Sequence, residues 1–250
     1  MSQPAIKGQE HWTTKGDVRL FLWEKASPVS PAPARHHPLR ARLLDGVAAA
    51  SAYIMRTRGV HHFLVYGISS GALRAALFAQ RHPERVRRLA LDAFVWTGRG
   101  SPTLADRRKR LPEYQAKNRR PIDRAFVRSI FERDHPGTAD DDVVAALADA
   151  ILALDDSVPT GTYVDMCAKL PVVDPEKITA ATIILRGEYD GIASVEDLLD
   201  FFARLPNPDK QFAVMPGIAH ASLQQKNVRI LYHLLQNFFG QPEPVYRGHH

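Results

Sequence analysis

The segment Gly67-Ile68-Ser69-Ser70-Gly71 matches the pattern G-x-S-x-G, which places a serine between two glycines. This spacing is typical of a tight turn that follows a strand, opens a helix and leaves one serine hydroxyl exposed. The turn would also direct the Ser70 backbone N–H and the helix N-terminus toward the oxygen of a bound carbonyl. We expect Gly67 and Gly71 to be required, because a Cβ at either position would collide with neighbouring backbone. The pattern predicts Ser69 as a nucleophile; the alternative is a glycine-rich turn with a spare serine.

A serine hydroxyl at neutral pH needs a histidine as base, and the histidine needs a carboxylate to orient it. Asp190 follows an apolar run at 183–187, and His220 follows a second run that ends in Pro-Gly. Both would lie beyond the carboxyl ends of parallel strands, where the sites of open α/β sheets collect. Asp190 has two rivals: Asp92 also follows a predicted strand, and Glu188 is close by.

The elements that position these residues alternate between short apolar runs and helical patterns, which predicts a mostly parallel α/β sheet covered on both faces. A hairpin is expected at 10–24, with its turn at 15–17. Strands are expected at 62–67, 86–91, 181–186 and 211–215, and helices at 43–58, 70–81, 195–205 and 223–239.

Residues 98–175 form a predominantly helical insertion between two predicted strands, too long for a simple loop. Its candidate helices are 103–118, 121–133, 140–154 and 161–170. From residue 99 to residue 133 there are eleven Lys or Arg against four Asp or Glu, so the insertion could present a basic rim to anionic substrates. We favour the alternative of solvated helix faces.

The run 63–91 (FLVYGISSGALRAALFAQRHPERVRRLAL), together with 183–190 and 212–220, resembles the nucleophile strand, elbow, acid loop and histidine loop of α/β-hydrolases. The resemblance extends to about residue 239. It implies a hydrolase core at 1–97 and 176–250 and a helical cap at 98–175. It also implies a catalytic triad, in the family's chain order, with one oxyanion donor: Ser69, Asp190, His220 and the Ser70 backbone N–H. The implied reaction is hydrolysis of an ester or related acyl bond in a small-molecule acyl substrate.

This family also has a segment that the chain lacks. Its second oxyanion donor usually comes from a loop after an earlier strand, often marked by His-Gly, and this sequence contains no such dipeptide. The proline-rich linker 25–42 is too short for a strand, loop, helix and second strand, which need about 35 residues. A deletion, a reading error or natural reduction would explain the gap, and we favour the first two. We therefore expect a weakly active or unstable hydrolase; the alternative is a non-catalytic or impaired hydrolase-like binding protein.

The bulk composition fits a globular protein with one sizeable core, since 45% of 250 residues are hydrophobic. The net charge of +6 permits an acidic partner, but no nucleic-acid recognition module is evident, so we expect no nucleic acid. Cys167 is the only cysteine, which excludes an intramolecular disulfide. The sequence shows no signal peptide, membrane span, metal-ligand spacing or nucleotide-binding loop. We expect a cytoplasmic protein without cofactor, metal or membrane contact; the oligomeric state is open.

Overall fold

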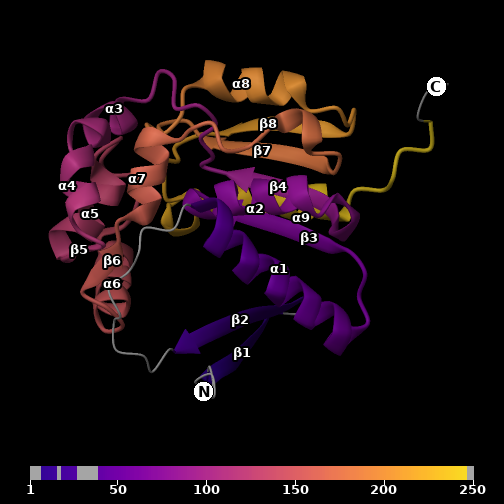
Figure 1. The fold of residues 1–250 in the computed structure, drawn as a ribbon, viewed down its shortest axis with the longest axis horizontal. Helices are drawn as coiled ribbons and strands as arrows, with labels where there is room; N and C mark the ends of the chain where they lie inside the picture. Colours follow the sequence, from indigo (N-terminus) through magenta and orange to yellow (C-terminus); the bar gives the residue numbers. More distant parts are fainter. Residues whose placement is uncertain (1–6, 16–17, 27–38, 247–250) are drawn as a thin grey trace. The chain divides into compact units, whose positions relative to one another are not determined.

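Four parallel strands form the central sheet, in the order β3-β4-β7-β8 (Figure 1). The computed structural model describes residues 7–15, 18–26 and 39–246, and the side chains from Val47 onward. Two units can be separated, Met1–His36 and His37–His250, and the sheet belongs to the second.

The strands of the sheet are β3 (Phe63–Ile68), β4 (Val86–Asp92), β7 (Ala181–Gly187) and β8 (Lys210–Met215). The two inner strands, β4 and β7, are the most apolar and are almost entirely buried, as expected for parallel strands covered on both faces. All four strands lie within one residue of their predicted bounds. The predicted α/β fold with a mostly parallel sheet is confirmed.

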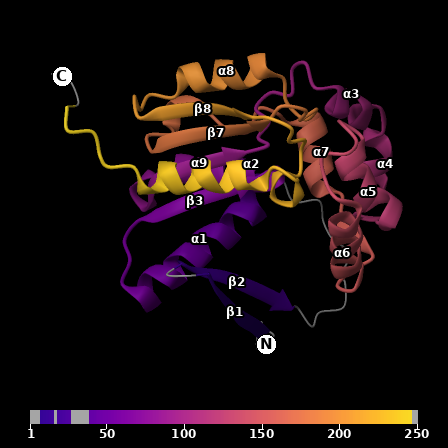
Figure 2. The same cartoon turned by 180° about the vertical axis from the view of Figure 1, so that it is seen from behind.

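Helices cover both faces of the sheet. On one face α2 (Ser70–Arg81) and α8 (Val195–Arg204) pack against β4 and β7, and on the other α9 (Val228–Gly240) packs against β7 and β8. Figure 2 shows α9 in front of the sheet, with α2 and α8 further back. A further helix, α1 (Leu39–Arg58), contacts α2. It ends as predicted at Gly59, whose positive φ of 65° suits a glycine.

The insertion between β4 and β7 contains five α-helices and a two-stranded antiparallel sheet: α3 (Pro102–Lys109), α4 (Leu111–Ala116), β5 (Arg119–Pro121), α5 (Arg124–Glu132), α6 (Asp141–Leu152), β6 (Ser157–Pro159) and α7 (Gly161–Ala168). Its helices lie together beside the sheet (Figure 1). The predicted helix 103–118 is divided at Arg110, because Pro112 has no N–H to continue the helical bonding. Three short 3-10 helices, Pro83–Arg85, Pro175–Lys177 and Ser222–Gln224, complete this unit.

The first unit is a hairpin of β1 (Lys7–Lys15) and β2 (Val18–Ala26), paired antiparallel with Lys15 opposite Val18. The predicted hairpin is confirmed, although residues 16–17 of its turn lie outside the described residues. Residues 27–38 of the predicted linker also lie outside them. The last residues of that linker, from Leu39, are helical and not irregular.

β3 occupies one edge of the described sheet. It pairs with β4 alone, and Leu64 on β3 is 49% exposed. Among the described residues, β4 is the only strand that is hydrogen-bonded to β3.

Candidate active site

Ser69 lies in the turn between β3 and α2, and its backbone adopts φ 55° and ψ −122°. A positive φ is uncommon for a residue with a side chain and costs on the order of 1–3 kcal/mol, which the surrounding structure must offset. The Ser69 N–H donates to the Asp92 carbonyl over 2.9 Å and so anchors the turn to β4. Ser70 begins α2, so its N–H has no acceptor within the helix.

The two glycines of the pattern differ in their surroundings. A Cβ on Gly67 would lie 2.4 Å from the Gly71 carbonyl oxygen and 2.8 Å from the Ala75 Cβ, so only glycine fits there. A Cβ on Gly71 would meet no atom within 4 Å. The predicted collision is therefore confirmed at Gly67 and wrong at Gly71, where the first turn of α2 leaves open space.

The structure brings the three predicted side chains together. Ser69 Oγ lies 2.8 Å from His220 Nε2, and His220 Nδ1 lies 3.0 Å from Asp190 Oδ1. The imidazole and the carboxylate are buried, whereas Ser69 is half-buried. Both distances suit hydrogen bonds in which His220 Nδ1–H donates to the carboxylate and Nε2 accepts the serine proton.

Two backbone hydrogen bonds join the acid loop after β7 to the histidine loop after β8. The Glu188 N–H donates to the Met215 carbonyl over 3.0 Å, and the Tyr189 N–H donates to the Ile218 carbonyl over 2.9 Å. A Cβ on Gly187 would lie 2.5 Å from the Ile218 oxygen, so this glycine permits the close approach. The two loops therefore act as one support for the acid and the histidine.

Comparison with known proteins agrees with this geometry. Residues 30–227 match the protein family described as serine aminopeptidase, S33 (Hydrolase_4). The chain belongs to this α/β-hydrolase family. No curated protein matches the sequence at a significant level.

Several solved α/β-hydrolases share the fold of this family member at low identity. An α/β-hydrolase from a Medee basin deep-sea metagenome is 18% identical with a TM-score of 0.59, over 93% of this chain and 83% of that chain. An esterase from Thermogutta terrifontis is 20% identical with a TM-score of 0.59, over 89% and 81%. Monoglyceride lipase from Saccharomyces cerevisiae is 16% identical with a TM-score of 0.61, over 89% and 77%.

Arg186 of this hydrolase, which the sequence interpretation did not single out, is hydrogen-bonded to the backbone of the acid loop. Its guanidinium donates to the carbonyls of Gly187 (2.8 Å), Glu188 (2.9 Å) and Asp190 (3.0 Å). An arginine that ends a buried strand next to a glycine is the only sequence signal for this role, and it is a weak one. The contacts fix the path of the backbone that carries Asp190.

The environment of Asp190 keeps its carboxyl ionised. Burial alone would raise the pKa of this carboxyl, but the charge and hydrogen bond of His220 and the further contacts of the loop together bring the pKa below its usual value. The Ile192 N–H, which donates to Oδ1 over 2.9 Å, and the charge of Arg186 lower the pKa further. An ionised carboxylate here can fix the imidazole tautomer and stabilise an imidazolium.

The two rival acids of the hydrolase contact other groups. Asp92 is buried, and its Oδ2 accepts hydrogen bonds from the Tyr66 hydroxyl over 2.7 Å and from the Ser222 hydroxyl. Glu188 accepts from the Gly217 N–H over 2.8 Å and so steadies the histidine loop. Of the three candidate acids, only Asp190 is hydrogen-bonded to the His220 ring.

The helical insertion touches the acid loop at several points. His135 stacks on Tyr189 with ring centroids 3.8 Å apart, and the Ser101 hydroxyl donates to the Gly191 carbonyl over 3.2 Å. A Cβ on Gly191 would lie 2.5 Å from Asp134 Oδ1. The insertion of this hydrolase is thus packed directly against the residues that follow Asp190.

Two general findings concern the described residues alone. None of their helices is both long and apolar enough to span a membrane. They also contain no cluster of three or more His, Cys, Asp or Glu side chains placed to hold a metal ion.

Proposed function

We propose that this α/β-hydrolase cleaves an ester or related acyl bond of a small-molecule substrate through Ser69, His220 and Asp190. The single observation that carries the proposal is the continuous hydrogen-bonded chain from Ser69 Oγ through the imidazole to the Asp190 carboxylate. Nucleophile, base and orienting acid are then all present in the order that acyl transfer requires.

In the proposed reaction, Ser69 Oγ forms a bond to the acyl carbon while His220 Nε2 takes the hydroxyl proton. The oxygen of the tetrahedral intermediate accepts a hydrogen bond from the Ser70 N–H and faces the N-terminus of α2. The intermediate collapses when the bond to the leaving group breaks and His220 returns the proton to that group. Water then attacks the acyl-enzyme with the same base, which releases the acid and restores Ser69.

The insertion from α3 to α7 serves in this proposal as a cap at 98–175 over the hydrolase core at 1–97 and 176–250. Its contacts to the acid loop, at Tyr189 and Gly191, support that role. A cap in that position would limit access of water and shape the entrance for substrate. The chemistry requires no cofactor, metal, nucleic acid or membrane.

Comparing two substrates would show whether the bond that is cleaved is an ester or an amide. The family description names an aminopeptidase, whereas the solved neighbours include an esterase and a lipase. We favour an ester, and p-nitrophenyl acetate should be turned over faster than an aminoacyl p-nitroanilide at equal concentration. The opposite order would assign an amide substrate within the same mechanism.

Slow turnover is expected whether the substrate is an ester or an amide. Loss of one oxyanion donor commonly costs a factor of about 10² to 10³ in kcat, and the sequence lacks the segment that would carry the second donor. β3 is hydrogen-bonded only to β4 among the described strands, and Leu64 on β3 is exposed, so no described strand is paired there to support a loop with the second oxyanion donor. This favours a second candidate function, a hydrolase-like protein that binds its ligand without cleaving it.

Labelling with a fluorophosphonate probe separates the two candidates. A hydrolase with an activated serine should be labelled on the peptide that contains Ser69, and Ser69→Ala should abolish labelling. Ser129→Ala, which removes an exposed hydroxyl from α5, should be labelled like the parent. No labelling of a folded parent, or equal labelling of Ser69→Ala, would favour the binding protein.

A further inference from the structure

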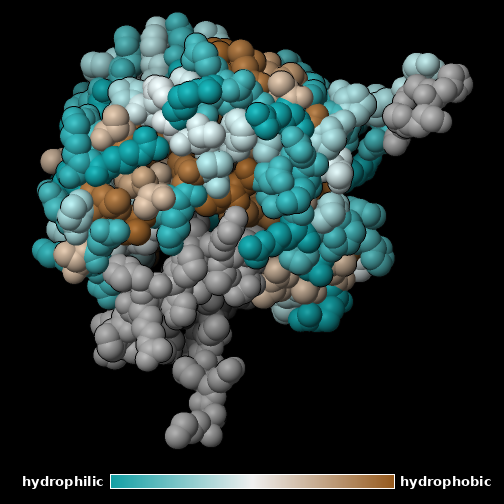
Figure 3. All heavy atoms as spheres, turned by 45° about the horizontal axis from the view of Figure 1, so that its top comes forward, coloured by the Kyte–Doolittle hydropathy of each residue, from teal (hydrophilic) through white to brown (hydrophobic). Residues whose placement is uncertain are grey.

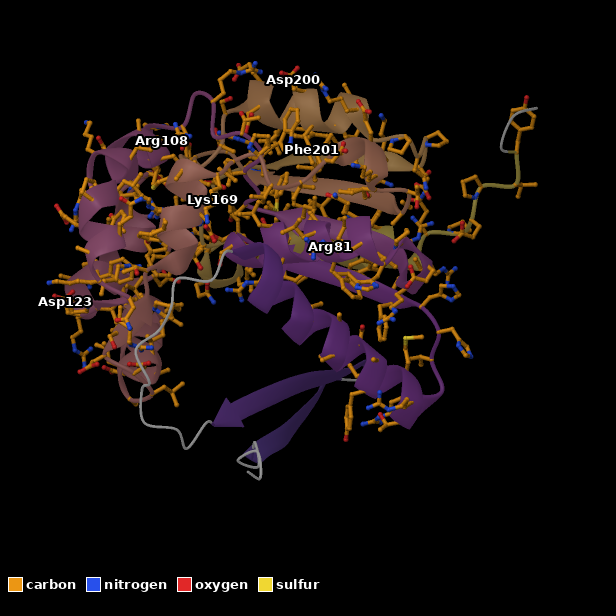
Figure 4. The ribbon with its side chains drawn as sticks, in the orientation of Figure 1. Arg81, Arg108, Asp123, Lys169, Asp200 and Phe201 are labelled. Carbon is orange, nitrogen blue, oxygen red and sulfur yellow. The ribbon has the colours of Figure 1, made fainter. Side chains whose placement is uncertain are left out.

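A large cavity lies within the helical insertion, apart from the three residues of the proposed triad. Its volume is ≈ 1040 Å³, and its walls come from α3, α4, β5, α5 and the Tyr163 side chain of α7. Ser69, Asp190 and His220 are not among its lining residues. Figure 4 labels Asp123, one of the lining residues, at the outer side of the insertion. The space is in the range of small-molecule sites.

Basic side chains outnumber acidic ones on the cavity wall. Six lining residues are basic (Arg107, Arg110, Lys117, Arg119, Arg120 and Arg133) and four are acidic (Asp106, Glu113, Asp123 and Asp134). Part of the basic segment 99–133 therefore lines this cavity. In the space-filling view of one face, the side that carries the insertion is mainly hydrophilic (Figure 3).

The acidic residues of the wall already have other partners. Asp106 pairs with Lys109, Glu113 with Arg110, and Asp134 with Arg133. Asp123 accepts from the Phe126 N–H as the N-terminal cap of α5. Two of these partners, Arg110 and Arg133, are cations of the same wall, and the wall residue Arg119 pairs with Asp155. The wall cations without an ion pair among the described residues are therefore Arg107, Lys117 and Arg120.

Arg107 and Arg120 share a single aromatic ring. Their Cζ atoms lie 4.3 and 4.2 Å from the centroid of the Tyr163 ring, which Tyr114 meets edge-on at 5.2 Å. Neither guanidinium forms an ion pair with a carboxylate among the described residues, and the Arg120 Nε atom is buried without a hydrogen-bond acceptor there. Contact with the same tyrosine ring brings the two planar guanidiniums near each other. Their N–H groups can therefore still donate hydrogen bonds to a ligand.

The electrostatics around Arg107 point the same way. Burial is the main cause that lowers the pKa of the Arg107 guanidinium, and the charges of Arg133 and Arg120 lower this pKa further. Each of these guanidiniums remains charged at neutral pH, because arginine loses its proton only at very high pH. The cavity thus concentrates positive charge that an anion would neutralise.

We propose that this cavity is a binding site for a multiply charged oxyanion, held by the Arg107 and Arg120 guanidiniums beside Tyr163. Phosphate and carboxylate groups match the paired N–H donors of a guanidinium, which bind two oxygens at once. A singly charged anion would leave one of the two cations uncompensated. The ligand is therefore a small molecule that carries a phosphate group or at least two carboxylates.

Isothermal titration of the full chain tests the site with pyrophosphate and citrate, against chloride at equal ionic strength. We expect one anion to bind per chain, and the tighter of the two probes identifies the phosphate or the carboxylate class. Arg107→Gln and Arg120→Gln should each weaken binding by about tenfold or more, since each removes a charge-assisted pair of hydrogen bonds. Binding of neither probe beyond chloride would overturn the proposal.

Matched variants decide where the anion binds. Arg124→Gln removes the same charge from an exposed residue of α5 that pairs with Asp149 outside the cavity wall, and should bind like the parent. If the Gln variants do not fold, Arg107→Lys and Arg120→Lys keep the charge and should still weaken binding by removing the planar fork. Undiminished binding in folded Arg107 and Arg120 variants, or equal loss in Arg124→Gln, would place the anion elsewhere and refute the site.

Ser69→Ala keeps this test independent of the proposed reaction. The variant should bind pyrophosphate or citrate with the parent's affinity, even though labelling of the serine is lost. Loss of anion binding in Ser69→Ala would locate the anion at the serine and overturn the cavity as its site. A chain that binds the anion but is never labelled by fluorophosphonate would disprove the proposed catalysis alone.

Discussion

The Tyr66 hydroxyl donates a 2.7 Å hydrogen bond to the buried Asp92 at Oδ2, whereas the His220 ring is hydrogen-bonded to Asp190. Asp92 is the last residue of β4 and Asp190 follows β7 of the same sheet, so position along the chain alone does not distinguish the two acids. Their hydrogen-bond partners distinguish the two acids: Asp92 accepts from Tyr66 and Ser222, and Asp190 accepts from the His220 imidazole.

Asp92→Asn should remove a pH dependence of stability. Burial raises the pKa of Asp92 from 3.8 to about 6, although the hydrogen bonds from Ser222 and Tyr66 partly oppose burial. The native state therefore binds this proton more tightly than the unfolded state, and the free energy of unfolding falls as pH rises from about 4 to about 6. The parent should lose about 3 kcal/mol relative to the variant across that window.

Urea denaturation followed by circular dichroism from pH 4 to pH 8 measures this difference. Asp106→Asn, an exposed partner of Lys109, should parallel the parent at every pH. A parent and an Asp92→Asn variant whose unfolding free energies stay equally far apart across the window would show that Asp92 does not titrate there.

Asp190→Asn should reduce kcat far more than Asp92→Asn. The amide that replaces the Asp190 carboxylate could not hold the His220 tautomer that accepts the Ser69 proton, and loss of an orienting carboxylate can cost a factor of about 10⁴. Steady-state hydrolysis of p-nitrophenyl acetate by both variants at pH 7.5 measures the effect. Should Asp92→Asn prove the more damaging of the two, Asp92 would be the acid of the triad.

Local patterns were sufficient to predict the sheet and the nucleophile turn, because strand, turn and helix are encoded within a few neighbouring residues there. The four strands and α2 lie where their apolar periodicity indicated. β5 and β6, each three residues long, carry too little pattern to be recognised. The helix break at Arg110 was missed although Pro112 marks it, because the charged run before it continues the helical pattern.

Apart from the triad, which the family resemblance implied, contacts between distant segments could not be derived from the sequence. Arg88 of β4 is an example, because its side chain is fully buried and pairs with Asp209 at 3.0 Å. The support that Arg186 gives to the acid loop depends on the carbonyl directions of that loop, which no local pattern specifies. The basic run of the insertion likewise gave no sign that Arg107 and Arg120 would meet on Tyr163.

Gly67→Ala should be damaging and Gly71→Ala should be tolerated. The new Cβ at 67 would collide with the Gly71 backbone, so we expect a loss of about 1–3 kcal/mol in unfolding free energy and a distorted Ser69 turn. At 71 an alanine enters the first turn of α2 without collision and should be neutral or stabilising by up to about 1 kcal/mol. Urea denaturation of both variants tests this contrast, and equal losses would mean that the space beside Gly71 is filled.

Arg186→Met should lower kcat more than it raises KM. The methionine fills part of the space but removes the hydrogen bonds to the carbonyls of Gly187, Glu188 and Asp190. The Gly187 carbonyl keeps the Asp190 N–H as a donor, whereas the carbonyl of the buried Asp190 loses its arginine donor, and an unpaired buried acceptor costs about 1–3 kcal/mol. The acid loop would then hold Asp190 less well against His220, so the transition state suffers more than substrate binding. Steady-state kinetics well below the melting temperature of the variant separate this effect from unfolding.

The same substitution at an exposed arginine serves as the control for Arg186→Met. Arg128→Met removes an exposed arginine that pairs with Glu132 and Asp141 on the insertion, and should leave kcat unchanged. Arg186→Lys, which retains a cation but reaches fewer carbonyls, should fall between the parent and Arg186→Met in kcat. An Arg186→Met variant with a lower melting temperature but the parent's kcat would limit Arg186 to a structural role, since Asp190 would then keep its position without those contacts.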